Sequence, residues 1–198
     1  MFSKSNLLSS VQLIKSLSKA FRTPFHLGTS AQSYYGCCYS TAQMVKPATP
    51  IKLFKITNEA TNTDELFSAN GKVIVFGVPG AFTPVCSNKH VPSYINNLKQ
   101  LKDKGVSKVI CVSVNDSFVM KAWKEKVAPE ADIEFIADPF GEFTRQVGLE
   151  IDLTAAGLGK RSKRYAMLVE NGTVKQLFVE ESPGQLEKTT AENMLTHL

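Results

Sequence analysis

Cys86 is the residue of this chain whose type and position best fit chemical reactivity. It ends the stretch VPGAFTPVC (residues 78–86), which follows a β-branched run and precedes a helical pattern. The pattern predicts Cys86 in the first turn of a helix, where unpaired backbone N–H groups and the positive end of the helix dipole gather. Both features favour a thiolate over a thiol, and the thiolate is the nucleophilic form of cysteine.

The residues around Cys86 bear on whether it is reactive or only packs in the core. A lone buried cysteine often behaves as a small apolar side chain. Here a glycine and two prolines fix the preceding loop and let its backbone approach a small ligand, and Thr83 stands three residues before the cysteine. This context favours a reactive cysteine.

The other cysteines and the histidines show no metal-binding pattern. There is no CxxC pair and no Cys/His cluster at zinc-ligand spacing, so we expect no structural metal. Four cysteines in 198 residues are also too few for a typical disulfide-rich secreted scaffold. The remaining residues of the two types are Cys37, Cys38, Cys111, His26, His90 and His197.

Alternating strand-like and helix-like segments must position Cys86. Short apolar runs predict buried strands, and apolar residues at helical spacing predict helices between them. Strands are expected at 72–78, 108–114 and 133–137, and helices at 91–104, 117–127 and 140–147. In the helix at 117–127 we expect Phe118, Ala122 and Trp123 to face inward, with Asp116 or Ser117 as the N-cap.

A hairpin and a final helix complete the predicted domain. Segments 163–170 and 173–180 alternate, and Asn171-Gly172 between them is a strong hairpin signal. The last helix is expected at 190–197. Strand–helix–strand units imply parallel pairing and the hairpin adds an antiparallel edge, so residues 47–198 predict one α/β domain with a central mixed sheet flanked by helices.

Residues 1–42 read as an organelle transit peptide. They are rich in Ser and Thr and lack acidic residues, and their basic side chains gather on one side of a helical wheel. The expected destination is the mitochondrial matrix, with the chloroplast stroma as the alternative. A disordered tail that carries no targeting signal is the further alternative. Cleavage near residues 40–46 would remove Cys37 and Cys38 with this leader.

Charge and hydropathy exclude two classes of partner. The net charge is +5, but the first 46 residues carry five basic and no acidic side chains, so the rest of the chain is balanced. A balanced folded body makes a nucleic-acid surface unexpected. No apolar run approaches the roughly 18–20 residues needed to cross a bilayer, so we expect no membrane partner.

The pattern Pro79-x3-Thr83-x2-Cys86 resembles the active-site motif of the peroxiredoxins. The strings GVPGAFTPVCSNKHVP, KGVSKVICVSVNDSFVMKAW and RSKRYAMLVENG extend the similarity from about Ile51 to the C-terminus. They resemble the type II, peroxiredoxin-5-like, atypical 2-Cys group, in particular its plant-type mitochondrial form. The resemblance implies a thioredoxin-like fold and a peroxidase without metal, haem, flavin or other cofactor.

The resemblance also implies a role for each matching residue. Cys86 corresponds to the peroxidatic cysteine, and Thr83 to the residue whose hydroxyl bonds the thiolate and the peroxide oxygen. Pro79 corresponds to the proline that shields the thiolate from water, and Arg164 to the arginine that stabilises the thiolate and the transition state. Arg161 competes for that last role, but we expect it to be a solvated charge at a strand entry. We expect His90, one turn from Cys86, to support the helix or its packing.

The implied reaction is the reduction of hydrogen peroxide and alkyl hydroperoxides through a sulfenic acid on Cys86. Cys111 matches a resolving cysteine proposed for plant-type members, yet its apolar strand also fits a purely structural role. The alternative reductants are thioredoxin, or glutathione with glutaredoxin. The resemblance further implies a homodimer. A peroxide sensor or redox relay that passes a disulfide to partner proteins is the alternative function.

Overall fold

The computed structural model describes residues 50–68 and 71–198 of the 198-residue chain. The predicted leader at 1–42, with Cys37 and Cys38, therefore lies outside the described residues. Within the described part, no helix is both long enough and apolar enough to span a membrane.

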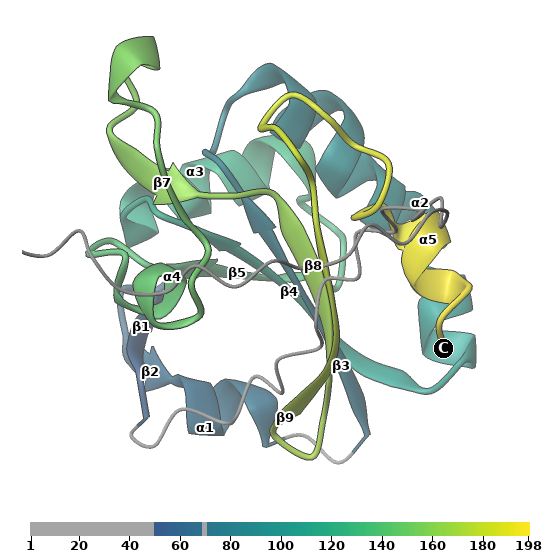
Figure 1. The fold of residues 1–198 in the computed structure, drawn as a ribbon. Helices are drawn as coiled ribbons and strands as arrows, with labels where there is room; N and C mark the ends of the chain where they lie inside the picture. Colours follow the sequence, from purple (N-terminus) through teal and green to yellow (C-terminus); the bar gives the residue numbers. More distant parts are fainter. Residues whose placement is uncertain (1–49, 69–70) are drawn as a thin grey trace, which may run out of the picture. The chain divides into compact units, whose positions relative to one another are not determined.

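A seven-stranded mixed sheet forms the centre of the described domain (Figure 1). Its strand order is β2-β1-β5-β4-β3-β8-β9. The neighbours β3, β4 and β5 are parallel, whereas β8, β9, β1 and β2 add antiparallel strands on both sides. The strands are β1 (Lys52–Lys55), β2 (Ala60–Asn62), β3 (Lys72–Val78), β4 (Val106–Ser113), β5 (Glu134–Ala137), β8 (Tyr165–Glu170) and β9 (Thr173–Val179).

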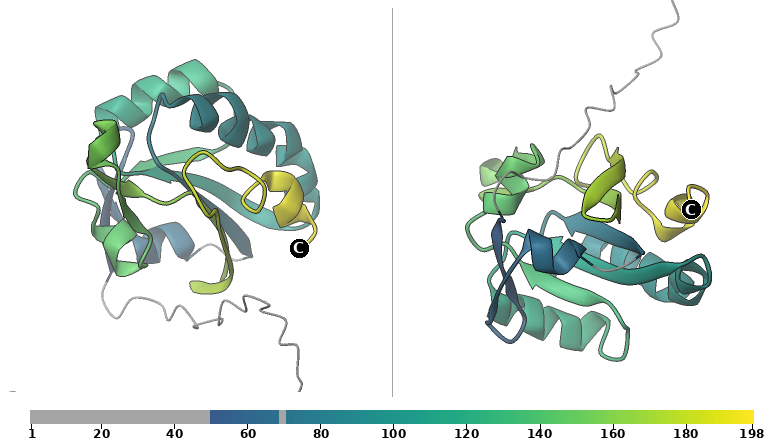
Figure 2. Two further views of the ribbon diagram at one scale, coloured as in Figure 1. Left: turned by 45° about the horizontal axis from the view of Figure 1, so that its top comes forward. Right: turned by 90° about the horizontal axis from the view of Figure 1, so that it is seen from below.

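Helices cover both faces of this sheet (Figures 1 and 2). One core cluster joins residues of α2 (Val91–Asp103), α3 (Ser117–Val127) and α5 (Ala191–Leu195) to one face. A second cluster joins α1 (Thr63–Phe67) and α4 (Glu142–Gln146) to the other. Successive strand residues point to opposite faces, so the continuous apolar runs of β3 and β4 supply both clusters. The predicted mixed sheet flanked by helices is confirmed.

The hairpin prediction is confirmed by the backbone at its tip. Asn171 and Gly172 have φ angles of 50° and 72° between β8 and β9. Two successive residues at positive φ are what a type I′ turn requires, and this turn matches the right-handed twist of the flanking strands.

The prediction for the inward face of α3 is wrong for two of three residues. Trp123 is buried, but Phe118 is 70% exposed and Ala122 is also exposed. Asp116 caps the helix through the backbone N–H of Val119. Trp123 and Met120, three residues apart, share the buried face, whereas Phe118 lies five residues from Trp123 and so points elsewhere.

Two short antiparallel pairs were not predicted. The first is β1 with β2, which extends the sheet beyond β5. The second is a separate sheet of β6 (Glu150–Asp152) and β7 (Lys160–Ser162), joined through the short helix η2 (Thr154–Ala156). These four strands have three or four residues each and lack the continuous apolar run that marks the equally short β5, so the sequence does not reveal them.

Candidate active site

Cys86 lies in the first turn of the helical segment after β3, as predicted. The helix begins at Pro84, and the Ser87 N–H donates to the Thr83 carbonyl at 2.9 Å. Residues Cys86–His90 then form one wide π-helical turn, η1, before α2 continues. Such turns often occur at functional sites. The thiol is free and buried, so a ligand for it must be small.

Arg164, immediately before β8, brings a positive charge to the Cys86 sulfur. Its side chain is 1% exposed, and Nη1 donates to Cys86 Sγ at 3.4 Å. Because charges interact strongly away from bulk water, a buried guanidinium at this distance stabilises negative charge on the sulfur. The structure thus brings together two residues that are 78 positions apart in the chain.

His90 holds Arg164 and does not touch the sulfur in any described contact. Arg164 Nη1 lies 3.1 Å from His90 Nδ1, and His90 Nε2 lies 3.0 Å from the Thr189 carbonyl. Arginine only donates and a carbonyl only accepts, so Nδ1 accepts and Nε2 carries the proton. Burial, and next the nearby Arg164 charge, lower the pKa of His90 to about 3. His90 is therefore a neutral acceptor that orients the guanidinium.

The remaining donors of Arg164 are unequally satisfied. Nη2 donates to the Pro183 carbonyl at 2.7 Å. Nε is buried and has no hydrogen-bond partner among the described residues. An unsatisfied buried donor costs about 1–3 kcal/mol, so this N–H is available to a ligand that accepts a hydrogen bond.

Thr83 and Pro79 lie in the loop between β3 and the helix. The Thr83 hydroxyl donates to the Gly80 carbonyl at 2.9 Å, not to the cysteine sulfur. Pro79 is buried at the end of β3, where it removes one backbone N–H from the loop. A Cβ added at Gly80 would lie 3.1 Å from Arg161 Nη1 and 3.3 Å from Thr83 Cγ2, so only glycine fits without displacing a neighbour.

The expectation that Arg161 is a solvated strand-entry charge is wrong. Arg161 is half-buried and donates to the Leu158 carbonyl at 2.7 Å and to Asn115 Oδ1 at 3.2 Å. Asn115 Oδ1 also accepts from the Ala81 N–H at 3.0 Å. Arg161 and Asn115 therefore hold the loop between β3 and the Cys86 helix against the end of β4.

Sequence reasoning did not single out Asn115. A signal existed, because Asn115 follows β4 directly and the carboxyl ends of neighbouring parallel strands meet at one edge of a sheet. β3 ends next to β4 at this edge, so a polar residue there was in position to contact the loop that bears Cys86.

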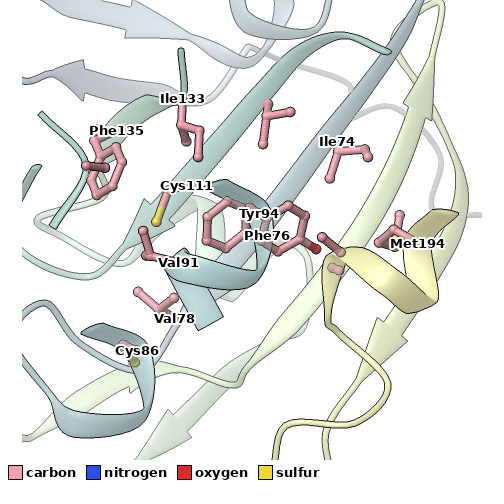
Figure 3. Packing of buried hydrophobic residues seen from close by; sticks show 14 of the residues in the cluster. Ile74, Phe76, Val78, Cys86, Val91, Tyr94, Cys111, Ile133, Phe135 and Met194 are labelled. Atoms are coloured by element: carbon pink, nitrogen blue, oxygen red, sulfur yellow. The ribbon is translucent and has the colours of Figure 1, made fainter. Parts of the chain in front are cut away.

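Cys111 lies in β4 on the sheet face that packs against the Cys86 segment. Both cysteines belong to one core cluster together with Val78 and Val91 (Figure 3). Cys111 is fully buried and free. Burial raises the pKa of the Cys111 thiol well above its usual range, and the neighbouring Cys86 raises it further. In this conformation Cys111 is an apolar thiol, not a nucleophile.

A buried cysteine in the first turn of a helix, in contact with a buried arginine from a strand end, is the arrangement of a thiol-based redox site. The redoxin family model matches residues 45–195. Reduced Prx3 from Vibrio vulnificus, in complex with hydrogen peroxide, has a similar crystal structure. Its TM-score is 0.72 at 45% identity, over 79% of this chain and 97% of that one.

Curated relatives agree with this match. Peroxiredoxin-2C of Oryza sativa subsp. japonica is 50% identical over 66% of this chain and 80% of its own length. Mitochondrial peroxiredoxin-2F of Arabidopsis thaliana is 49% identical over 63% of this chain and 62% of its own length. Chloroplastic peroxiredoxin-2E of the same plant is 44% identical over 70% of this chain and 59% of its own length.

The chain belongs to the peroxiredoxin family, in the type II group that the sequence motifs indicated. It is a thiol-dependent peroxidase with a thioredoxin-like fold.

Proposed function

We propose that Cys86 reduces hydrogen peroxide and alkyl hydroperoxides by displacement at oxygen. The Cys86 thiolate attacks one oxygen of ROOH, so that an S–O bond forms and the O–O bond breaks. The sulfur is oxidised by two electrons, and the departing RO⁻ takes up a proton to leave as alcohol or water. Cys86 remains as a sulfenic acid.

The contact between Arg164 Nη1 and Cys86 Sγ carries this proposal. Arg164 holds the sulfur negative before attack, and its free Nε–H donates to a peroxide oxygen as charge develops on the breaking bond. The Thr83 hydroxyl turns from the Gly80 carbonyl to the peroxide. Pro79 keeps a backbone donor, and the water it would bind, away from the sulfur.

Trapping of the sulfenic acid tests this assignment. The reduced protein is treated with one equivalent of hydrogen peroxide in the presence of dimedone and then digested for mass spectrometry. We expect the adduct on Cys86, and none in a Cys86→Ser variant. An adduct on Cys111 alone would overturn the assignment.

We further propose that Cys111 resolves the sulfenic acid after η1 unwinds. The Cys111 thiolate attacks the Cys86 sulfur, the S–O bond breaks, hydroxide leaves as water after protonation, and a disulfide forms. The two residues share a core cluster, which supports this step. Both thiols are buried in the helical conformation, so the first turn must open to give the geometry that a disulfide needs.

The competing route uses an external thiol, supplied by glutathione with glutaredoxin or by thioredoxin. Non-reducing mass spectrometry after stoichiometric peroxide separates the routes. A Cys86–Cys111 bond supports internal resolution. A persistent sulfenic acid on the monomer, with turnover restored by glutathione and glutaredoxin in the Cys111→Ser variant, assigns resolution to the external thiol.

We propose a homodimer that buries exposed aromatic side chains near the site. Phe82, Phe118 and Phe140 are 48%, 70% and 68% exposed. They follow the C-terminal ends of β3, β4 and β5. Because these strands are parallel, all three side chains belong to the same end of the sheet as Cys86. Phe82 also has a φ of 62°, a costly conformation for a residue other than glycine. Sedimentation of a Phe118→Glu variant should show a monomer where the wild type is a dimer.

We propose that the leader delivers the enzyme to the mitochondrial matrix. The basic, acid-free composition of residues 1–42 and the mitochondrial relative support this destination. The chloroplastic relative keeps the chloroplast stroma as the alternative. Import into isolated mitochondria and chloroplasts, followed by N-terminal sequencing, distinguishes the two and locates the cleavage site.

A further inference from the structure

The loop between β9 and α5, residues 180–190, supplies the outer partners of the catalytic arginine. The Pro183 carbonyl accepts from Arg164 Nη2 at 2.7 Å, and the Thr189 carbonyl lies 3.0 Å from His90 Nε2. Neither contact involves a side chain of the loop. The orientation of these two carbonyls therefore depends on what fixes the loop backbone.

Glu180 fixes that backbone from inside the loop. Its side chain is only 6% exposed, and Oε1 accepts from the Glu187 N–H at 2.8 Å. The same oxygen accepts from both the N–H and the hydroxyl of Thr189, each at 2.9 Å. A carboxylate oxygen can accept several charge-assisted hydrogen bonds, which are stronger than neutral ones.

Thr189 transmits this constraint to the site. Its N–H and hydroxyl bind Glu180, while its carbonyl accepts from His90 Nε2 and from the Tyr94 hydroxyl at 2.9 Å. Thr189, His90 and Tyr94 are fully buried. Water cannot readily replace a lost partner in such a network, so its members depend on one another.

The last links reach the sulfur. Arg164 Nη1 donates to His90 Nδ1 at 3.1 Å, and this guanidinium nitrogen also donates to Cys86 Sγ at 3.4 Å. The backbone N–H of Glu180 also donates to the Arg164 carbonyl at 3.0 Å. A continuous chain of hydrogen bonds thus joins the Glu180 carboxylate to the reacting atom.

From this chain we propose that Glu180 is a positioning residue of the peroxidase, acting through Thr189 and His90 on the direction of the Arg164 guanidinium. The inference rests on the proposed roles of Cys86 and Arg164. Without the carboxylate, the Thr189 peptide turns, His90 loses its acceptor, and the guanidinium no longer points its N–H groups at both the sulfur and the peroxide.

The test compares Glu180→Gln with Glu181→Gln in the full chain. The Glu180 variant keeps the shape of the side chain and one acceptor oxygen, but it removes the charge that strengthens the three hydrogen bonds to Glu187 and Thr189. Glu181 is the matched control, because it is an exposed neighbour whose carboxylate pairs with Lys188 on the surface. The readout is the single-turnover rate of reduced protein with hydrogen peroxide, followed by mass spectrometry of Cys86 across pH 5–9.

We expect Glu180→Gln to lower the peroxide rate about tenfold and to alter its pH profile, as loss of outer partners of a site often does. Glu181→Gln should match the wild type. A Glu180→Gln rate within twofold of the wild type, in a protein of normal thermal stability, overturns the inference.

A double variant separates positioning from a general structural effect. If Glu180 acts through Arg164, then Glu180→Gln should add little to the loss caused by Arg164→Lys. If the rate losses of the two single variants multiply in the double variant, the inference is overturned. A full rate in Arg164→Lys alone would instead reject the proposed function of Arg164, which keeps the two failures distinct.

A milder variant covers the case in which Glu180→Gln does not fold. Thr189→Val removes one of the three donors to Glu180 and keeps the backbone N–H. We expect the peroxide rate of Thr189→Val to fall about threefold, consistent with the loss of one net hydrogen bond. An unchanged rate would overturn the inference.

Discussion

Cys86 and Cys111 share one core cluster and the same degree of burial, yet their surroundings differ in charge. Both have an exposure of 0%, and both are free thiols. Cys86 begins a helical turn and accepts from Arg164, which His90 orients. Cys111 pairs along the sheet with Phe76 and Phe135.

The two cysteines differ in their charged contacts and not in their burial. Burial raises the pKa of the Cys111 thiol, and the nearby Arg164 opposes this effect only as the smallest of the contributions. At Cys86 the same guanidinium is in hydrogen-bond contact with the sulfur. A cation in contact, and not the degree of burial, distinguishes Cys86 from Cys111.

Exchanging the two thiols for hydroxyls gives the largest expected effect. Cys86→Ser should abolish peroxide consumption, because a serine hydroxyl is not ionised at neutral pH. Cys111→Ser should consume the first equivalent of peroxide at the wild-type rate. A stopped-flow assay with reduced protein measures both. Residual turnover by Cys86→Ser would show that the two positions are not distinct in function.

Arg164→Lys tests whether contact with a cation is what separates the two sites. Lysine keeps the charge but loses the planar fork that reaches the sulfur, His90 and Pro183 together. We expect the peroxide rate to fall about 100-fold, as for loss of a preorganised donor. Arg161→Lys is the matched control, because Arg161 holds the loop through Asn115 and has no described contact with the sulfur. Equal losses in both variants would contradict the assignment.

The pH dependence of the unfolding free energy tests whether His90, near Cys86, is uncharged in the folded protein. The unfolded chain binds a proton on histidine below about pH 6.5, whereas folded His90 does so only near pH 3. Its contribution to stability is therefore full above pH 6.5 and declines as the pH falls toward 3. From pH 7 to 5 we expect a loss of about 2 kcal/mol from this group.

Urea denaturation at pH 7, 6 and 5 measures how steeply the free energy of unfolding falls as the pH is lowered. His90→Asn should flatten this dependence, while His197→Gln should not, because His197 is exposed. Equal slopes in the wild type and His90→Asn would show that His90 is charged in the folded protein.

Ser87→Ala should have a smaller effect, on the rate at which Cys86 and Cys111 form a disulfide. Trp123 Nε1 donates to Ser87 Oγ at 3.0 Å and so ties the turn after Cys86 to α3. Removal of the acceptor leaves the indole N–H unsatisfied in the folded state and favours opening of η1. We expect Cys86–Cys111 disulfide formation to accelerate about fivefold, measured by quenched non-reducing mass spectrometry. Ser107→Ala, remote from the turn, is the control. An equal rate of disulfide formation in both variants would show that the Trp123–Ser87 hydrogen bond does not hold η1 closed.

Much of the framework was predictable because local patterns encode it. The apolar run of β3, the Asn171-Gly172 turn and the capped α3 each carry their own signal within a few residues. The placement of Cys86 in a first helical turn followed from the same signals. The burial of Phe118 was predicted wrongly, because one apolar residue near a helix end does not fix which face it joins.

The partners of the site were less predictable, because they come from distant segments. Arg164 was assigned through the family resemblance, and nothing in local spacing placed it beside Cys86. Asn115 and Glu180 accept hydrogen bonds from backbone N–H groups of loops, and Thr189 acts through its own carbonyl, so no local motif marks these contacts.

The sequence by itself determined the mixed α/β order of elements, the strand-to-helix position of Cys86 and the family, because periodicity, turn residues and an extended motif are local. Only the tertiary structure decided that Arg164 contacts the sulfur, that His90 orients Arg164, and that Cys111 packs in the same cluster as Cys86. Those contacts depend on how β8 pairs with β3 and how the 180–190 loop folds back, and both are set by packing between residues far apart in the chain.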